Sequence, residues 1–87
     1  MTNWEVAEAP IRASSRKHGV DEADIRHALR NWIRVADADD DVVLYLGSDR
    51  AGRLIEVGVR SDEDGIRIVH AMRPARDHRF ERGRQRT

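Results

Sequence analysis

The stretch VVLYLGSDRAGRLIEVGVRSDEDGIRIVHAMR (42–73) decides the fold, because it alternates apolar and polar residues between short turns. Together with the preceding IRVAD, it predicts four strands, over residues 33–37, 42–47, 53–60 and 65–73. The turns between these strands are too short for a crossover, so consecutive strands must pair antiparallel. The sequence therefore predicts a four-stranded antiparallel meander.

Helical signals lie on both sides of these strands. The helix predicted over residues 22–32 follows a suitable N-cap, Asp21, and its apolar residues share one face. Pro10 and Gly19 are typical of the start and end of a short first helix, and a proline also opens a last helix predicted over residues 74–82. The expected fold class is α+β, with two N-terminal helices packed on the meander sheet, followed by a C-terminal helix.

Length and composition limit the classes of protein. The chain has 87 residues, of which 39% are hydrophobic, so we expect one α+β domain over residues 1–82 and a basic flexible tail over 83–87. The absence of cysteine excludes disulfides and thiolate metal sites. No apolar run has the length of a membrane span, and the N-terminus does not resemble a secretory signal. A soluble, cytoplasmic protein is expected.

The charges are balanced in number but not in position. The chain has 16 basic and 16 acidic residues, and Lys17 is the single lysine. Residues 73–87 contain six arginines against two acids. The meander places the acidic turns at one end of the sheet and Arg50 and Arg53 at the other. Arginine favours planar, bidentate partners such as phosphate, so this separation of charge indicates an anionic partner.

The alternation along the strands predicts which side chains share a face. In the third strand Ile55, Val57 and Val59 should face the helices, and in the fourth strand Ile66, Ile68, His70 and Met72 should share one face. The opposite face would then carry Arg60, Arg67, Arg73, Glu56 and Tyr45. An open face of arginines with one tyrosine fits a phosphate backbone and a stacked base, whereas cross-strand Glu–Arg pairs on a solvated face are the alternative.

The candidate catalysts are few. His78 lies between Arg76 and Arg79 and is the best placed general acid or base, whereas His70 is expected to be a partly buried structural residue. No metal-binding spacing and no serine-nucleophile motif is present, so we expect no metal and no cofactor. The remaining chemistry is RNA cleavage, in which a ribose 2′-hydroxyl attacks the adjacent phosphate and arginines neutralise the developing charge.

Three segments resemble the RelE-like toxins of bacterial toxin–antitoxin pairs, in particular the BrnT type. They are RKHGVDEADIRHAL (16–29), GRLIEVGV (52–59) and GIRIVHAMRPARDHRFE (65–81). The resemblance implies an ααββββα ribonuclease fold, inhibition of translation by RNA cleavage, and neutralisation by a cognate antitoxin. One departure is that the family's last strand ends in Ala-Arg, whereas here Ala71 is followed by Met72.

These observations predict a toxin of a type II toxin–antitoxin pair, acting as a metal-independent endoribonuclease. The predicted catalytic residues are Arg73, Arg76, Arg79, His78 and Tyr45. The predicted RNA-binding residues are Arg60, Arg67, Arg53, Arg50 and, from the resemblance, His18. The alternative is a non-catalytic interaction module whose arginine-rich C-terminus binds an acidic partner protein or RNA. Neither hypothesis involves a membrane.

Overall fold

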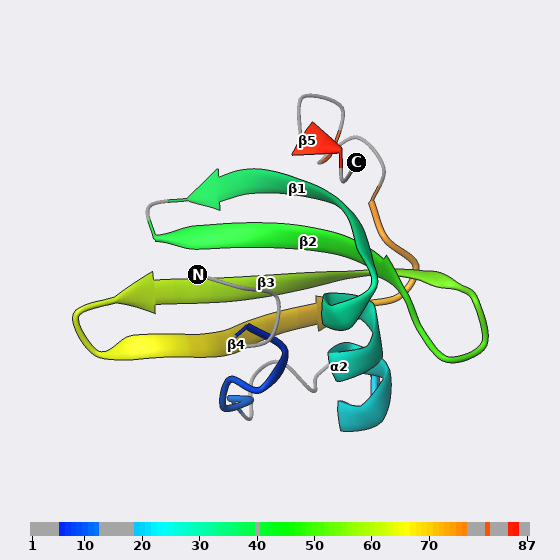
Figure 1. Cartoon of the computed structure of the whole chain (residues 1–87), viewed down its shortest axis with the longest axis horizontal. Coiled ribbons are helices and arrows are strands. Elements are labelled where there is room, and N and C mark those ends of the chain that lie inside the picture. Colours follow the sequence, from blue (N-terminus) through cyan, green and yellow to red (C-terminus); the bar gives the residue numbers. More distant parts are fainter. Residues whose placement is uncertain (1–5, 13–18, 40, 77–79, 81–83, 86–87) are drawn as a thin grey trace.

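The structure is a computed structural model, and it describes residues 6–12, 19–39, 41–76, 80 and 84–85. These residues form an α+β fold with one full helix and one antiparallel sheet (Figure 1). The elements are α2 (Glu22–Arg30), β1 (Trp32–Asp39), β2 (Val42–Ser48), β3 (Leu54–Asp62), β4 (Gly65–Met72) and β5 (Arg84–Gln85). The strand order β4-β3-β2-β1-β5 makes the first four strands a meander, to which β5 adds at the outer edge of β1.

Helix α2 begins after the predicted N-cap. The carboxylate of Asp21 accepts the backbone N–H of Asp24 at 3.0 Å, which satisfies one of the amide donors that a helix leaves open at its start. Gly47 of β2 lets the helix approach the sheet, because a Cβ there would collide with the carbonyl of Ala28. The helix predicted over residues 22–32 is therefore present, and it ends at Arg30.

One hydrophobic core lies between α2 and the sheet. Its most buried members are Ile25 and Leu29 of α2, Ile55, Val57 and Val59 of β3, and Ile68 and Ala71 of β4, each at most 3% exposed. Burying one such aliphatic side chain contributes about 1.5–3 kcal/mol, so this layer holds α2 on the sheet. The helix-facing residues predicted for the third strand are confirmed.

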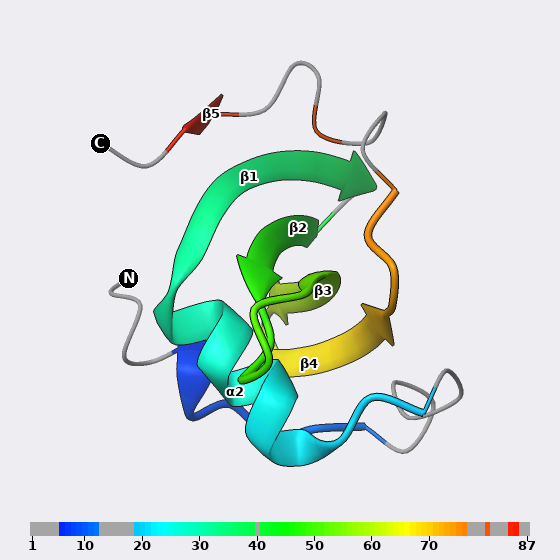
Figure 2. The ribbon, with the colours of Figure 1, turned by 90° about the vertical axis from the view of Figure 1, so that its right-hand side faces the viewer.

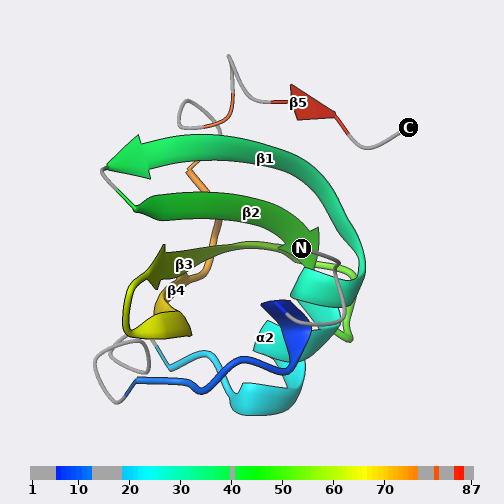
Figure 3. The same ribbon diagram turned by 60° about the vertical axis from the view of Figure 1, so that its left-hand side comes forward.

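The first predicted helix is wrong. After a helical turn at residues 6–7, Ile11 makes a parallel β-bridge to Ile68 of β4. The N–H of Ile68 donates to the carbonyl of Pro10 at 2.8 Å, and the N–H of Arg12 donates to the carbonyl of Ile68 at 2.9 Å. Pro10 thus precedes an extended segment beside α2 (Figure 3), because the outer edge of β4 offers unpaired backbone groups. Residues 13–18 lie outside the described part of the chain.

The C-terminal helix predicted over residues 74–82 is also wrong where the structure describes its start, at residues 74–76, and residues 77–79 and 81–82 lie outside the described part of the chain. The N–H of Ala75 donates to the carbonyl of Leu54 at 3.2 Å, and the N–H of Arg76 donates to the side chain of Glu56 at 2.8 Å. Both donors are therefore used on β3, and neither residue is helical. Within the described residues, the fold expected from the sequence and from the resemblance is thus corrected to one full helix on a four-stranded meander with a short added strand. The division at residue 82 stays a prediction.

A second core lies on the face of the sheet opposite α2, which we call the second face. Phe80, 1% exposed, packs with Leu44 and Leu46 of β2, and Ala36, Ala38 and Ala75 pack against this group. Figure 2 shows the segment directly after β4, up to residue 76, running along this side of the sheet. The second face is therefore covered over β1 and β2, where the sequence predicted an open surface.

Candidate functional site

A β-bulge in β4 decides which side chains reach the second face. Val59 pairs with Ile68 but Gly58 pairs with His70, so Val69 is an extra residue in the ladder. The bulge reverses the alternation: Ile68 and Ala71 both face α2, whereas His70 lies beyond the bulge on the side of Gly58. The sequence placed His70 on one face with Ile68, and this assignment is wrong because regular alternation does not hold across a bulge.

On the second face, His70, Glu56 and Arg76 form a compact cluster. His70 Nε2 lies 2.9 Å from Glu56 Oε2. Arg76 donates to the same carboxylate from Nη2 at 2.6 Å and from Nε at 3.0 Å. The Glu56 side chain is fully buried, whereas 28% of the His70 side chain and 35% of the Arg76 side chain are exposed. The oriented imidazole of His70 and the guanidinium of Arg76 are therefore both partly exposed to solvent in one cluster.

Glu56 is ionised over the whole neutral range. Burial by itself would raise the pKa of this carboxyl group. Hydrogen bonds from the side chain and backbone of Arg76, and from His70, outweigh burial and lower the pKa of Glu56 to about 2. The carboxylate therefore holds a negative charge beneath the imidazole, where its hydrogen bond with Nε2 can orient the ring.

The residue opposite His70 is a glycine for a steric reason. A Cβ on Gly58 would lie 3.0 Å from the Cβ of His70 and 3.4 Å from Leu44 Cδ2. Any larger residue would therefore press on the imidazole or on the second core. Gly58 leaves room for the ring of His70 beside the apolar group of β2.

Arg60 of β3 and Arg67 of β4 lie farther along the sheet, where they occupy directly opposite positions in the β3–β4 ladder. Arg67 is engaged by Asp62, with Nη1 and Nη2 at 2.8 and 2.9 Å from the two carboxylate oxygens. Among the described residues, Arg60 makes no ion pair and is partly exposed. Since Arg60 follows Gly58 by two residues on one strand, its Cα lies about 7 Å farther along the same face.

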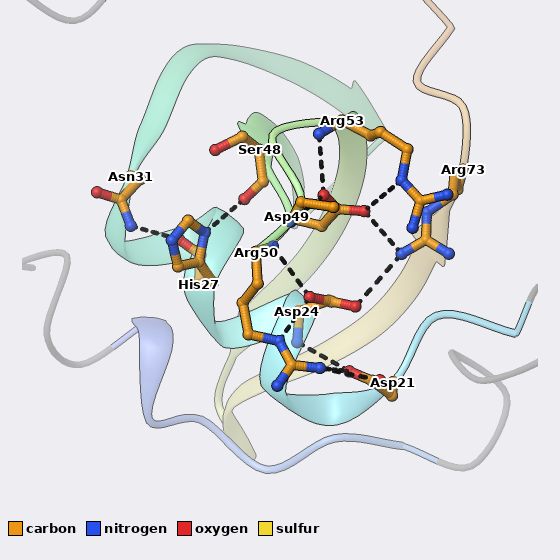
Figure 4. A network of polar contacts seen from close by, with 10 residues as sticks. Asp21, Asp24, His27, Asn31, Ser48, Asp49, Arg50, Arg53 and Arg73 are labelled. Atoms are coloured by element: carbon orange, nitrogen blue, oxygen red, sulfur yellow. Dashed lines mark hydrogen bonds and ion pairs between the residues drawn. The ribbon is translucent and has the colours of Figure 1, made fainter.

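The other predicted arginines form a separate network at the end of the sheet near α2 (Figure 4). Arg50 binds Asp24 through Nε at 2.8 Å and Asp21 through Nη2 at 3.2 Å. Arg73 Nη2 lies 2.9 Å from Asp49 Oδ2 and 3.4 Å from Asp24 Oδ2. A further arginine, Arg53, contacts the same Asp49 oxygen at 3.2 Å. These guanidinium groups are bound to acids of their own chain.

The pKa values of two acids in this network, Asp24 and Asp49, are lowered. Hydrogen bonds from the side chain and backbone of Arg50 lower the pKa of Asp24 to about 2. At Asp49, burial would raise the pKa, but the backbone N–H groups of Arg53 and Ala51 and the nearby guanidinium groups lower it. Both carboxylates stay charged at neutral pH, so the positive end predicted for the sheet is largely neutralised.

The acidic end is present as predicted. The β1–β2 and β3–β4 turns lie together at one end of the sheet (Figure 1), and they carry exposed acids, Asp41, Glu63 and Asp64. A nucleic acid would be repelled at that end. The opposite end, or the second face itself, is therefore the better approach for an anion.

Of the predicted catalytic residues, the structure describes Tyr45, Arg73 and Arg76, and it does not bring these three together. Tyr45 faces α2, where it packs against the first core and meets Trp32 edge to face at 6.0 Å between ring centroids. Arg73 lies at the α2 side, whereas Arg76 lies on the second face. His18, His78 and Arg79 lie outside the described residues. No sequence signal marks the bulge that brings His70 to Glu56, and regular alternation placed the two residues on opposite faces of the sheet.

Comparison with protein-family models, with curated proteins and with solved structures found no match for this chain. Within the described residues, no group of three acid, histidine or cysteine side chains is arranged to hold a metal ion. The helix in this part of the chain is too short and too polar to cross a bilayer.

Proposed function

We propose that this protein is a metal-independent endoribonuclease whose centre is the cluster of His70, Glu56 and Arg76. One observation carries this proposal: the imidazole of His70 is bound 2.9 Å from a buried, ionised carboxylate that also holds an arginine, and both the imidazole and the guanidinium are partly exposed to solvent. The resemblance of residues 65–81 to BrnT-type toxins supports the same activity. The toxin role, a cognate antitoxin and action in the cytoplasm belong to this proposal.

In this mechanism His70 is the general base. When Nε2 donates to Glu56, the lone pair of the neutral ring lies on Nδ1, which takes the proton of a ribose 2′-hydroxyl. The 2′-oxygen bonds to the adjacent phosphorus while the bond from phosphorus to the 5′-oxygen breaks. The departing oxygen takes a proton from water, so the products are a 2′,3′-cyclic phosphate and a 5′-hydroxyl.

The arginines stabilise negative charge on the phosphates of the RNA. Arg76 lies against the same carboxylate as His70, so its guanidinium can neutralise the charge that develops on the phosphate oxygens. Arg60, about 7 Å along the strand, can hold a neighbouring phosphate. Arg50, Arg53, Arg67 and Arg73, which the sequence assigned to RNA, are engaged by acids other than Glu56, outside the cluster, and take no part in this step.

The test is an RNA-cleavage assay with purified protein in the presence of a metal chelator. His70→Gln should lower the cleavage rate by about 10²- to 10⁴-fold, because it removes the base but keeps a polar side chain near Glu56. The matched control is His27→Gln on α2, whose ring binds the carbonyl of Ser48 on the other side of the sheet. It should change the rate by less than about twofold. Full activity of His70→Gln would reject this centre.

A non-catalytic interaction module is the second candidate, because the ion pairs count against arginine chemistry on RNA phosphates. Seven described arginines contact an acid of their own chain: Arg26, Arg30, Arg50, Arg53, Arg67, Arg73 and Arg76. Such pairing reduces the charge offered to phosphate. A wild-type protein that cleaves no RNA and whose RNA affinity is weak at every salt concentration would support this second function.

A further inference from the structure

The chain passes from one side of the sheet to the other directly after β4. Arg73 reaches the acids at the α2 side, and Arg76 reaches Glu56 on the second face. Three residue steps span at most about 10–11 Å, so the Cα of Arg76 must lie within that distance of the Cα of Arg73. The place where Arg73 is held therefore affects the cluster on the far side.

The site that holds Arg73 is formed by other parts of the chain. Asp49 is 1% exposed, and its Oδ1 accepts the N–H groups of Ala51 and Arg53 at 2.9 Å each. The turn is closed by a hydrogen bond of 2.8 Å from Asp49 N–H to the Arg53 carbonyl, with Gly52 at φ +84°. The other oxygen of Asp49, Oδ2, which also accepts a hydrogen bond from Arg53 Nε at 3.2 Å, is thus fixed in place by the β2–β3 turn, independently of Arg73.

Asp24 is fixed in the same way from the helix. Its Oδ1 accepts both the backbone N–H and the Nε of Arg50, which leaves Oδ2 directed at Arg73. The two acids therefore meet a single nitrogen of Arg73, Nη2, from two different elements (Figure 4). The Nε of Arg73 is buried without a hydrogen-bond partner in the described structure. A buried donor left unsatisfied costs about 1–3 kcal/mol, so Nε does not hold this side chain in its place. The contacts of Nη2 with Asp49 and Asp24 determine where the side chain lies.

We infer that Asp49, acting through Arg73, is a positioning residue for the cluster of His70, Glu56 and Arg76. The Asp49–Arg73 contact fixes the point at which the chain rounds the end of the sheet, so that Arg76 meets Glu56 with both its backbone N–H and its guanidinium. This role rests on the ribonuclease centre proposed above. Arg73 is then a structural anchor of that centre and does not touch the substrate.

Asp49→Asn tests this role. The amide oxygen can still accept the N–H groups of Ala51 and Arg53, so the turn is kept, but the nearer of the two carboxylate charges that hold Arg73 is lost. We expect kcat for RNA cleavage to fall by about ten- to a hundredfold with little change in KM, because Arg76 is displaced while Arg60 is untouched. The control is Asp21→Asn, which loses charge in the same network, remains a good N-cap and does not contact Arg73.

A spectroscopic measurement separates this inference from the proposed activity. The Arg76 Nε–H and His70 ring resonances should shift in Asp49→Asn and stay in place in Asp21→Asn. Arg73→Gln removes the same contact from the other partner and leaves the turn intact, so it should reproduce the shifts if Asp49→Asn folds poorly. Unmoved Arg76 and His70 resonances in both variants would overturn the positioning role. Shifted resonances in a protein that cleaves no RNA would support it and reject the ribonuclease.

Discussion

Glu56→Gln tests the physical basis of the buried cluster without any assumption about activity. The pKa of Glu56 falls from an ordinary value of 4.5 to about 2, which corresponds to about 3 kcal/mol of folding free energy at neutral pH. Glutamine keeps the shape but leaves Arg76 without its counter-ion. We therefore expect the free energy of unfolding to fall by about 3 kcal/mol at pH 7, or about 2 M in the urea midpoint at a slope of about 1.5 kcal/mol/M.

The pH dependence of this loss separates charge from shape. A carboxyl group whose pKa is depressed in the folded state contributes fully above its unfolded pKa and loses its contribution as the pH falls toward the folded value. The gap between wild type and Glu56→Gln should stay constant from pH 7 to about pH 5 and shrink by about 1.4 kcal/mol per pH unit below pH 4.5.

Urea unfolding between pH 3 and pH 7 measures this gap, with Glu63→Gln as the control. Glu63 is exposed in the β3–β4 turn, so its replacement should change the free energy of unfolding by less than about 0.5 kcal/mol at every pH. A Glu56→Gln gap that is equally large at pH 3 and pH 7 would mean that packing, and not charge, causes the loss. A gap below about 1 kcal/mol at pH 7 would refute the reasoning.

Three further predictions concern the packing around the sheet. Gly47→Ala should lower the free energy of unfolding by about 2–3 kcal/mol in urea titration, because its Cβ would meet the carbonyl of Ala28; an unchanged midpoint would show that α2 does not lie on β2 at this point. Phe80→Ala should cost about 3–5 kcal/mol in calorimetry, and a much smaller loss would contradict the second core. Asp21→Ala should lower the free energy of unfolding by about 1 kcal/mol in circular dichroism melting. An unchanged stability would show that the carboxylate of Asp21 does not bind the N–H of Asp24.

Local patterns predicted much of the fold because their physical causes are local. The N-cap at Asp21 depends on one side chain and an amide three residues away, and the alternation of β3 depends on adjacent residues. The short turns leave an antiparallel meander as the single way to join the strands. For these reasons α2 and the first four strands lie close to their predicted ranges.

The errors arise where distant residues compete with local preference. Pro74 is a good first residue for a helix, but the donors that follow it bind Leu54 and Glu56, and Phe80 packs on the far side of β2. Likewise, the extra residue Val69 in β4 cannot be recognised from an apolar run that alternates equally well in either register. The candidate site depends on both features, so sequence patterns alone could not assemble it.

The second core has a consequence for the folding of the chain during its synthesis. Leu44 and Leu46 leave the ribosome well before Phe80, the side chain that covers them, whereas the first core needs no residue later than Ala71. At about 5–20 residues per second, the nascent protein carries an uncovered leucine strip for a time on the order of seconds. A product that is released early, or stalled before Phe80, keeps that strip exposed and becomes a substrate for chaperones or a seed for aggregates.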